Sequence, residues 1–434
     1  MTDPATRMTE RLTEADIDHV FVEFADMNGL SRSKQFTTDR FLDVWKEGFP
    51  VNMLLLVQTP RNEVPKGSGF GKEIGYGDGR LHPDPETFTV LPWRDDAARV
   101  LCDVHYDGEP VDAAPRRTLK RVVASSAEHG LDFGIGSELE FYLLNETDNG
   151  YEPVTDHKHE WVSEATETLS PFYDQLSEWG PDYGIPIHSL EHEHGPGQLE
   201  VLFEHSDPLS QADTTFDFKR LVKRTATLSG HVGTFMAKPF AGESGSGYHL
   251  HVSAQRDGEN AFEARDDTLS ETGRQFVAGL LDHADALTAF GTPTLNGYKR
   301  LHPDGFAPYT ASWGYDNRMT AIRVPVGYTR AENRLAAADA NPYLLVAATL
   351  AAGIDGIRRE LEPTAAVERD PTDSRPVLPQ SPTAAFNSLE EDETLVDELG
   401  DAVIDAYLAN RRRDLAAFDN VVTDWERERY VDVS

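Results

Sequence analysis

Residues 136–141 carry two glutamates separated by a single apolar residue. Glu138 and Glu140 alternate there with Leu139 and Phe141. Successive side chains of a β-strand point to opposite faces, so a strand here would place both carboxylates on one face and both apolar side chains on the other. We expect the two carboxylates to line a cavity, with the apolar side chains packed behind them.

Two imidazoles and a hydroxyl follow the same period further along the chain. His249, His251 and Ser253 alternate with Leu250 and Val252. A third row holds Arg330, Glu332 and Arg334, and in a fourth Arg323 stands between two apolar residues. The apolar backing of each row is typical of core strands whose polar faces border a cavity.

Two more glutamates flank a glycine-rich turn, with Glu193 before it and Glu200 on the strand expected after it. If all these elements converge, they bring together five carboxylates and one imidazole: Glu138, Glu140, Glu193, Glu200, Glu332 and His249. Carboxylates a few ångströms apart repel by several kcal/mol per pair even at an effective dielectric of about 20. Cations must therefore be present. Oxygen ligands without thiolates favour Mg²⁺ or Mn²⁺ over zinc, and more than one ion is needed to balance the charge.

Each row also has a simpler interpretation. Glu-x-Glu is common on strands, buried structural histidines are frequent, and the row around Glu332 resembles an ordinary surface ion network. The combination of several such rows in one chain, each backed by apolar residues, favours a single functional cavity.

The elements that position these rows fall into two regions. With 434 residues and 39% hydrophobic content, the chain has room for a large domain and a smaller one. Alternation at 19–24 begins a small strand-rich unit, and we expect an N-terminal domain at 13–110 and a catalytic domain at 115–434. Glycine-rich residues 66–79 are expected to form an irregular loop. Apolar periodicity predicts helices at 116–129, 216–228, 275–287 and 342–354, and the helical spacing of Leu395, Leu399, Val403 and Tyr407 predicts closing helices in the last 50 residues.

Charge and composition exclude several kinds of protein. A formal net charge of -35 argues against nucleic acid as a partner, because phosphate recognition relies on basic patches. Acids spread along the whole chain, those at 390–393 included, indicate a solvated acidic surface suited to concentrated salt, and we take the source to be a halophile. The longest apolar run, 343–354, is too short to cross a bilayer, and no secretion signal is visible. A single cysteine fits a reducing cytoplasm.

The order of these segments resembles the signature of the glutamine synthetase family from about Val20 to the C-terminus. The matching segments are Glu138-x-Glu140, Glu193 to Glu200, Lys238-Pro239, Gly245 to Ser253, Asn296 to Leu301, Asn317-Arg318, Arg330-x-Glu332-x-Arg334 and Asn341-Pro342-Tyr343. The resemblance implies an α+β fold, with a small N-terminal β-grasp domain and a catalytic domain built on a curved antiparallel sheet flanked by helices. It also implies a ring-shaped homo-oligomer, commonly a dodecamer, with active sites between neighbouring subunits.

The same resemblance implies a role for each candidate residue. One metal ion would be held by Glu140, Glu193 and Glu200, and a second by Glu138, His249 and Glu332. His251 and Ser253 would lie beside ATP, Arg300 and Gly245 would hold glutamate with Arg334 nearby, and Arg318 and Arg323 would meet the transferred phosphate. Arg318, Arg323 and Glu332 are the expected catalytic residues. Glutamate would become a γ-glutamyl phosphate, which an amine then attacks to form an amide.

The resemblance to the family fails at the positions that would select the amine. Members that use ammonia carry a glutamate just before Ala-Pro, whereas this chain has Phe306 there, and residues 66–70 lack the acid usual beside Gly-Ser-Ser. An aromatic ring cannot accept a proton from ammonium, but it can pack against a longer amine or attract its charged end. We therefore expect a γ-glutamylpolyamine synthetase with putrescine as the leading substrate. The alternatives are a true glutamine synthetase, with Asp304 in place of the missing acid, and a non-catalytic regulatory homologue, which would be expected to lack site residues that are all present here.

Overall fold

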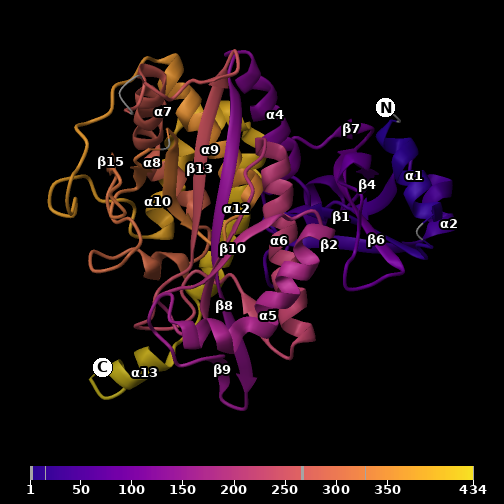
Figure 1. Ribbon diagram of the computed structural model, residues 1–434, viewed down its shortest axis with the longest axis horizontal. Coiled ribbons are helices and arrows are strands. Elements are labelled where there is room, and N and C mark those ends of the chain that lie inside the picture. The colour runs from indigo at the N-terminus through magenta and orange to yellow at the C-terminus, as the bar shows by residue number, and fades with distance from the viewer. Residues whose placement is uncertain (1–2, 15, 265–267, 328, 434) are drawn as a thin grey trace.

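The computed structural model describes residues 3–14, 16–264, 268–327 and 329–433, and it has an α+β architecture. A small lobe built on the first sheet stands beside a larger body built on the second (Figure 1). The two sheets fall on either side of Pro115, where helix α4 begins. The expected domain limits of 13–110 and 115–434 stay predictions.

The N-terminal sheet has seven strands within the described residues, in the order β2-β1-β6-β4-β3, with β5 and β7 paired to β6. Its strands are β1 (His19–Ala25), β2 (Ser31–Thr37), β3 (Phe49–Asn52), β4 (Asp78–Pro83), β5 (Thr89–Val90), β6 (Ala97–Tyr106) and β7 (Glu109–Pro110). Its helices are α1 (Pro4–Glu14), α2 (Thr38–Val44) and α3 (Leu54–Val57). The central pair, β1 and β6, is parallel, and alternate residues of β1 such as Val20 and Val22 are fully buried. These apolar residues explain why the 19–24 alternation folds as a strand.

Two features of this lobe differ from expectation. Helix α1 precedes the first strand, where no element was expected. This segment is helical because Met8 and Leu12, four residues apart, bury one face of the helix. The loop expected at 66–79 is not wholly irregular, since it contains a 3-10 turn, Lys72–Ile74, and the first residues of β4.

The second sheet positions the polar rows. Its main strand order is β10-β11-β8-β13-β17-β16-β15. These strands are β8 (Asp132–Thr147), β10 (Ile187–His192), β11 (Gln198–Phe203), β13 (Gly247–Arg256), β15 (Trp313–Tyr315), β16 (Ile322–Val324) and β17 (Ala331–Ala337). Three short strands pair at its margins: β9 (Gly150–Pro153), β12 (Val232–Thr234) and β14 (Glu259–Asn260). The pairing is antiparallel as expected, except that β15 and β16 are parallel.

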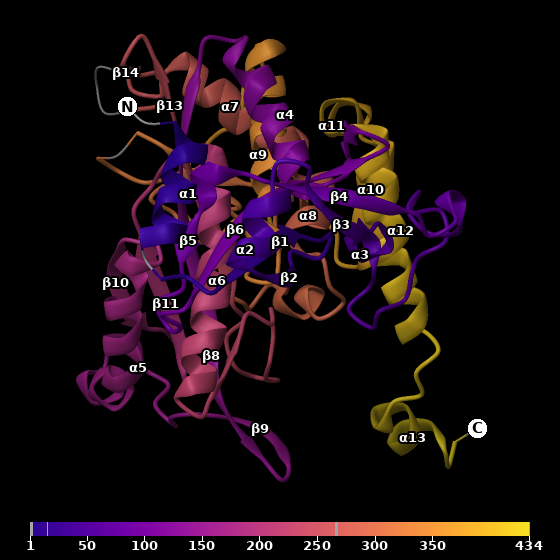
Figure 2. The same ribbon diagram turned by 90° about the vertical axis from the view of Figure 1, so that its right-hand side faces the viewer.

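Helices cover this sheet, with α9 at the centre of the body (Figure 1). They are α4 (Pro115–Ala127), α5 (Ser163–Asp182), α6 (Pro208–Leu228), α7 (Glu271–Asp282), α8 (Ala284–Gly291), α9 (Pro342–Arg358), α10 (Pro382–Glu391), α11 (Glu393–Leu399), α12 (Asp401–Phe418) and α13 (Asp424–Tyr430). Helix α9 is apolar on nearly all sides, which fits a helix enclosed by others. The C-terminal α13 stands away from the body (Figure 2). No helix in the described ranges is long and apolar enough to cross a membrane.

Hydrogen bonds fix the lobe to the body. Asn341, the N-cap of α9, donates from Nδ2 to the backbone oxygen of Asp26 at 3.1 Å. Asn410 of α12 donates to the backbone oxygen of Val57 at 2.8 Å. The turn after β1 and the end of α3 are therefore both tied to helices of the larger body.

Candidate active site

Strand register brings the polar rows together. Facing positions on neighbouring strands are Glu140 with Glu200, Glu138 with His249, and His251 with Glu332. Side chains at facing positions lie about 5 Å apart at their Cβ atoms. Strands β11, β8, β13 and β17 therefore gather the rows that the sequence separates by up to almost two hundred positions.

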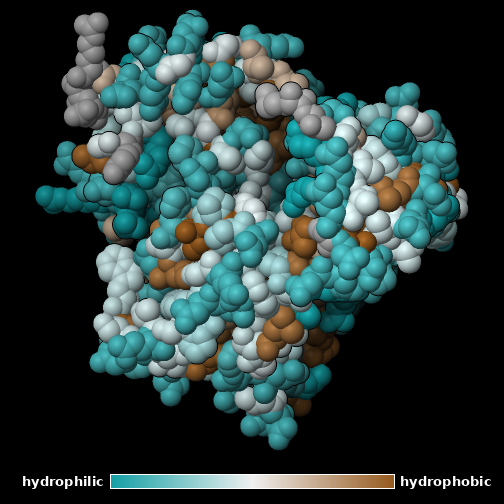
Figure 3. Space-filling model, turned by 45° about the vertical axis from the view of Figure 1, so that its right-hand side comes forward, coloured by the Kyte–Doolittle hydropathy of each residue, from teal (hydrophilic) through white to brown (hydrophobic). Residues whose placement is uncertain are grey.

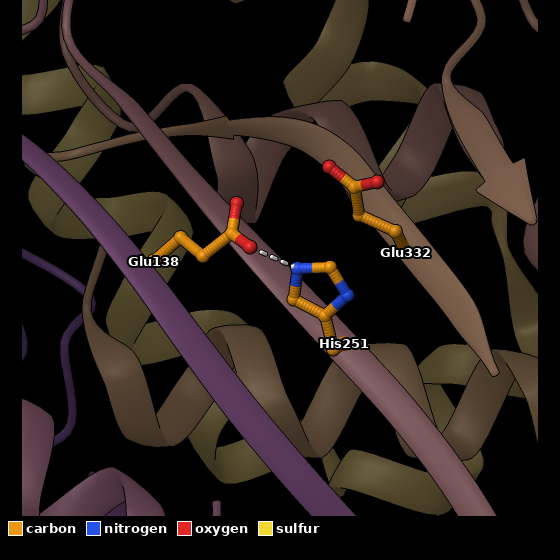
Figure 4. A group of neighbouring side chains, drawn as sticks. All are labelled: Glu138, His251 and Glu332. Carbon is orange, nitrogen blue, oxygen red and sulfur yellow. Dashed lines mark hydrogen bonds and ion pairs between the residues drawn. The ribbon is translucent and has the colours of Figure 1, made fainter. Parts of the chain in front are cut away.

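Glu138 lies at the centre of the cluster and points toward His251 (Figure 4). Its Oε1 is 2.6 Å from Nε2 of His251, and its Oε2 is 3.4 Å from Nδ1 of His249. Arg330 donates from Nε to Nδ1 of His251 at 2.8 Å, so Nδ1 accepts, and Nε2 carries the proton that is donated to Glu138. Burial raises the pKa of Glu138, but the hydrogen bonds with His249 and His251 outweigh it and hold the pKa well below its usual range. In this arrangement His251 orients the carboxylate.

Glu332 is fully buried between two arginines. Arg323 donates from Nη1 to its Oε2 at 2.8 Å, and Arg334 donates from Nη1 to its Oε1. Burial alone would raise the pKa of Glu332, but the charges of Arg334 and His249 lower it. Nδ1 of His249 is 3.8 Å from Oε1. Any metal ion bound here would share carboxylate oxygens that the arginines already contact.

A second group of carboxylates lies at the edge of β11, where no cation balances it within the described residues. Oxygens of Glu191, Glu193 and Glu200 all lie within 4.8 Å of one another. Burial, followed by the charges of Glu140 and Glu138, raises the pKa of Glu200 to about 10. Burial and the charge of Glu140 likewise raise the pKa of Glu193 to about 7. The cluster therefore favours either bound protons or bound cations.

Polar side chains crowd around Gly247, next to these carboxylates. A Cβ atom at Gly247 would lie 2.8 Å from Nε2 of His249, 3.1 Å from Oε1 of Glu140 and 3.4 Å from Nη2 of Arg300. Oε2 of Glu140 accepts from the backbone N of Gly247 at 2.9 Å, which fixes the carboxylate beside this glycine. At Gly245 a Cβ would lie 2.6 Å from Cγ of Arg300, so glycine is needed for the guanidinium to enter.

Two buried guanidinium nitrogens have hydrogens available for a ligand. Nη1 of Arg300 and Nε of Arg334 are buried and have no hydrogen-bond partner in the described part of the chain. Burial lowers the pKa of Arg300. Buried donors in proteins are almost always paired, and arginine pairs best with carboxylate or phosphate. An anionic substrate fits this part of the site.

The structure does not bring every candidate residue into the cluster. Arg318 lies exposed between β15 and β16 and forms no ion pair with any described residue. Ser253 lies on β13, two residues beyond His251. Phe306 is 70% exposed, and its ring centroid is 4.9 Å from that of His194.

Sequence reasoning missed Glu191 and Trp161. Glu191 precedes Glu193 by two positions, so the Glu-x-Glu spacing that singled out Glu138 was present here too. Nε1 of Trp161 donates to Oε2 of Glu191 at 3.0 Å, although the indole is highly exposed. The backbone N of Trp161 also donates to the backbone oxygen of His192 at 3.1 Å. Nothing in the local sequence around Trp161 indicates this attachment.

The residues present fit divalent metal ions. Three groupings place their ligand atoms within 4.8 Å of one another: Glu138 with His249 and Glu200, Glu138 with His251 and Glu332, and Glu191 with Glu193 and Glu200. Carboxylates with one imidazole suit Mg²⁺ or Mn²⁺, and the raised pKa values of Glu193 and Glu200 report negative charge that such ions would neutralise. Neither expected ligand set appears as one of these groupings: Glu191 takes the place of Glu140 beside Glu193 and Glu200, and His251 takes the place of His249 beside Glu138 and Glu332. Glu140 is instead held by Gln198 and Gly247.

Known proteins share this architecture along the whole chain. The family model for the catalytic domain of glutamine synthetase matches residues 112–430. A glutamine synthetase of Pyrococcus abyssi is 35% identical over an alignment that covers 93% of this chain and 98% of that protein. The γ-glutamylethanolamide synthetase GlnA4 of Streptomyces coelicolor is 35% identical, with 95% of this chain and 92% of that protein covered. The solved structure of apo GmaS superposes with a TM-score of 0.90 at 31% identity and full coverage of both chains.

Proposed function

This chain belongs to the glutamine synthetase family, whose members are ATP-dependent glutamate–amine ligases, and we propose that its preferred acceptor is an organic amine rather than ammonia. The product would be a γ-glutamyl amide. Putrescine remains the leading candidate, and the ethanolamide named in the Streptomyces relative makes a small hydroxyalkylamine the second. The observation that carries the proposal is the environment of Phe306.

Phe306 lies beside the turn that carries Glu193. Its ring packs against His194, the residue after Glu193, and most of its surface is exposed. A phenyl ring has no lone pair with which to bind or deprotonate ammonium, which needs carboxylates. The ring does offer apolar contact to methylene groups, and its face attracts a charged ammonium group at the far end of a longer amine.

Trp161, from another loop, supplies a second exposed aromatic beside the segment 191–194 that Phe306 contacts. Its two hydrogen bonds, to Glu191 and to the backbone of His192, hold the indole beside the carboxylates. Glu160 precedes Trp161 in the sequence, and its Oε1 is 3.4 Å from Nδ1 of His194, the residue that Phe306 contacts. Aromatic faces flanked by carboxylates suit a cation that also carries carbon, which describes an alkylammonium ion better than ammonium.

The roles of the remaining site residues are part of the proposal. We assign the metal ions to Glu138, Glu140, Glu193, Glu200, Glu332 and His249, with Glu191 added. Bound divalent ions would neutralise charge on the phosphates of ATP. Arg300 and Arg334, whose buried nitrogens lack partners among described residues, would bind the carboxylates of glutamate.

Phosphoryl transfer then needs positive charge around the moving phosphate. Arg323 is in place beside Glu332, and Arg318 would have to move inward. The γ-carboxylate attacks the terminal phosphorus, which gives γ-glutamyl phosphate and ADP. The neutral amine nitrogen next attacks the acyl carbon, a C–N bond forms, the C–O bond to phosphate breaks, and phosphate leaves with the proton that the nitrogen gives up. We also propose that the chain forms a ring-shaped homo-oligomer, with residues 66–70 of one chain closing the site of the next.

The direct test is to identify the product by mass. The enzyme is supplied with ATP, glutamate and Mg²⁺ in concentrated KCl, and ammonium is compared with putrescine, ethanolamine and methylamine at equal concentrations. We expect at least about tenfold higher kcat/KM for one organic amine than for ammonium, a difference of about 1.4 kcal/mol. Efficient glutamine formation with slow use of the organic amines would contradict the proposal.

Phe306→Glu tests the residue that carries the proposal. The new carboxylate should raise kcat/KM for ammonium relative to the preferred organic amine by about tenfold or more, because it restores a group that binds and deprotonates ammonium. Phe418→Glu is the matched control, since Phe418 is another exposed phenylalanine, at the end of α12. Equal amine preference in Phe306→Glu and the control would show that Phe306 does not select the amine.

A further inference from the structure

A cavity of about 620 Å³ lies between the N-terminal lobe and helix α6, away from the candidate active site. Figure 3 shows the lobe joined to the body, with apolar side chains gathered near the junction. One wall comes from the β1–β2 turn and the segment around Trp93, and the other comes from α6. None of the candidate metal, glutamate or phosphate residues is among the described residues that line it. The volume falls in the range of small-molecule sites, about 300–1,000 Å³.

The lining has the opposite charge to the rest of the molecule. Six of its fourteen described lining residues are basic, and none is acidic: Arg32, Arg94, Lys219, Arg220, Lys223 and Arg224. The whole chain has 75 acidic and 40 basic residues, so a random selection of fourteen would contain more acids than bases. This concentration of cations indicates a site for an anion.

Three of the six cations are balanced by the protein itself. Arg32 pairs with Asp26 at 2.8 Å, Arg94 with Asp96 at 2.7 Å and Arg220 with Glu23 at 2.5 Å. Each of these acids lies outside the lining, in the N-terminal lobe.

The other three cations, Lys219, Lys223 and Arg224, lie on α6 and form no salt bridge with any described acid. Lys219 donates from Nζ only to a backbone oxygen, that of Ala340, at 2.7 Å. Burial and the neighbouring Lys223 lower the pKa of Lys219 to about 7, and the charge of Asp339 offsets them only in part. Lys219 and Lys223, like Arg220 and Arg224, are four residues apart on one helix face, where like charges destabilise a helix. A bound anion would remove that repulsion.

Aromatic and apolar side chains complete the lining, among them Phe21, Trp93 and Phe216. Guanidinium groups bind carboxylate and phosphate groups through paired hydrogen bonds, and the aromatic surfaces suit the carbon skeleton between such groups. We propose that this cavity binds a small organic polyanion, with two or more carboxylate or phosphate groups, that bridges the N-terminal lobe and α6.

The same helix supports the strand that carries Glu138. On α6, Thr215 donates from Oγ1 to Oγ of Ser137 at 3.0 Å, and the ring of Phe218 lies 6.1 Å from that of Phe141. A ligand in the cavity therefore contacts a helix that packs directly behind the candidate metal site, so this site is in a position to influence catalysis.

Calorimetric titration of the full-length chain tests the proposal, without ATP, glutamate or divalent ions. Citrate serves as the tricarboxylate probe and fructose 1,6-bisphosphate as the phosphate probe, each at two KCl concentrations. We expect at least one of them to bind once per chain, and to bind more weakly at higher KCl. The affinities of the two probes then show whether the site prefers carboxylate or phosphate groups. The double variant Lys223→Gln/Arg224→Gln should bind at least tenfold more weakly.

The matched control is Lys46→Gln/Arg256→Gln, which removes the same charges from exposed positions outside the cavity. It should bind as the unmodified chain does. No binding of either probe, or equal affinity in both double variants, would overturn the proposal. The proposal would also be overturned if the unmodified chain bound neither probe and Lys223→Gln/Arg224→Gln formed a smaller oligomer. In that case the cations would contact a second copy of the chain instead of a small anion. Since no amine or ATP is present, these outcomes are independent of the proposed function.

Discussion

Glu332 is the residue on which most of the candidate site depends. The buried Arg334 and the partly buried Arg323 share its oxygens, and both histidines of the polar row lie nearby. Glu332→Gln keeps the shape but removes the charge, so Arg323 and Arg334 lose their common counter-ion and a candidate metal ligand is weakened. We expect turnover to fall at least about 100-fold while the oligomer persists.

The measurement is turnover dependent on ATP and glutamate across a Mg²⁺ titration, with native mass and circular dichroism as checks on folding. Glu390→Gln, which removes an exposed glutamate of α10, is the control and should keep full activity. Full activity of Glu332→Gln would remove Glu332 from the site.

For single residues, strand periodicity predicted most of the side chains that the candidate site brings together. The facing pairs of β8, β11, β13 and β17 all came from rows visible in the sequence, because period-two alternation fixes which side chains share a face. It could not place Trp161, whose position depends on the path of a loop. The expectation, drawn from the spread of acids along the chain, that Asp392 belongs to a solvated face is wrong: its side chain is only 13% exposed and pairs with His283.

Among the elements, a buried histidine between α7 and α8 contacts α9 and the junction of α10 with α11. His283 ends α7, where the predicted helix 275–287 breaks in two. Its Nδ1 is 2.6 Å from Oδ2 of Asp392, before α11, and its Nε2 is 3.1 Å from Oδ2 of Asp355 on α9. Asp355 also pairs with Arg358 and Arg359. Burial would lower the pKa of His283, but the two aspartates outweigh it and raise the pKa above 6.5.

This pKa shift predicts a pH-dependent stability. A folded-state pKa above the unfolded value means that the contribution of His283 is fully present below about pH 6.5 and is lost as the pH rises through the higher folded value. His283→Gln should lower the free energy of unfolding by about 1.5–3 kcal/mol at pH 6 and by less at pH 8.5. Urea titrations at both pH values measure this, and His129→Gln, at an exposed position, is the control. An equal loss at the two pH values would show that His283 is neutral in the folded protein.

Helices α7 and α9 cross so closely that only glycine fits at the crossing. A Cβ at Gly356 would overlap the backbone oxygen of Gln275, and one at Gly279 would overlap that of Ala352. Gly356→Ala should therefore lower the free energy of unfolding by about 1–3 kcal/mol. Without a close crossing, alanine would stabilise a helix interior by about 0.5–1 kcal/mol. The sign of the change in chemical unfolding thus tests the crossing directly.

The accuracy of element prediction followed the strength of the apolar pattern. The helices expected at 116–129, 216–228 and 342–354 are confirmed as α4, α6 and α9. Helix α5 was missed although Leu169, Phe172 and Leu176 follow a helical period, because Pro171 and Pro181 lie inside it and proline normally ends a helix. The break at His283 could not be foreseen, since it depends on aspartates distant in the sequence.

For the whole molecule, the dominant feature is the charge of -35. The face in Figure 3 is covered mainly by hydrophilic side chains. Acids outnumber bases by 75 to 40 in the chain, so many acids cannot have a basic partner of their own. Their mutual repulsion destabilises the folded state at low salt. Raising KCl from about 0.1 M to about 1 M shortens the Debye length from about 10 Å to about 3 Å, so Tm should rise by several degrees.

Comparing salts separates screening from cation binding. If screening is responsible, choline chloride at the same ionic strength should raise Tm as much as KCl does, because the Debye length depends only on ionic strength. If the acidic surface instead binds hydrated potassium specifically, only KCl should be effective. Scanning calorimetry in both salts, with the same preparation, distinguishes these cases. A Tm that stays constant or falls in both would contradict the prediction of a surface suited to concentrated salt.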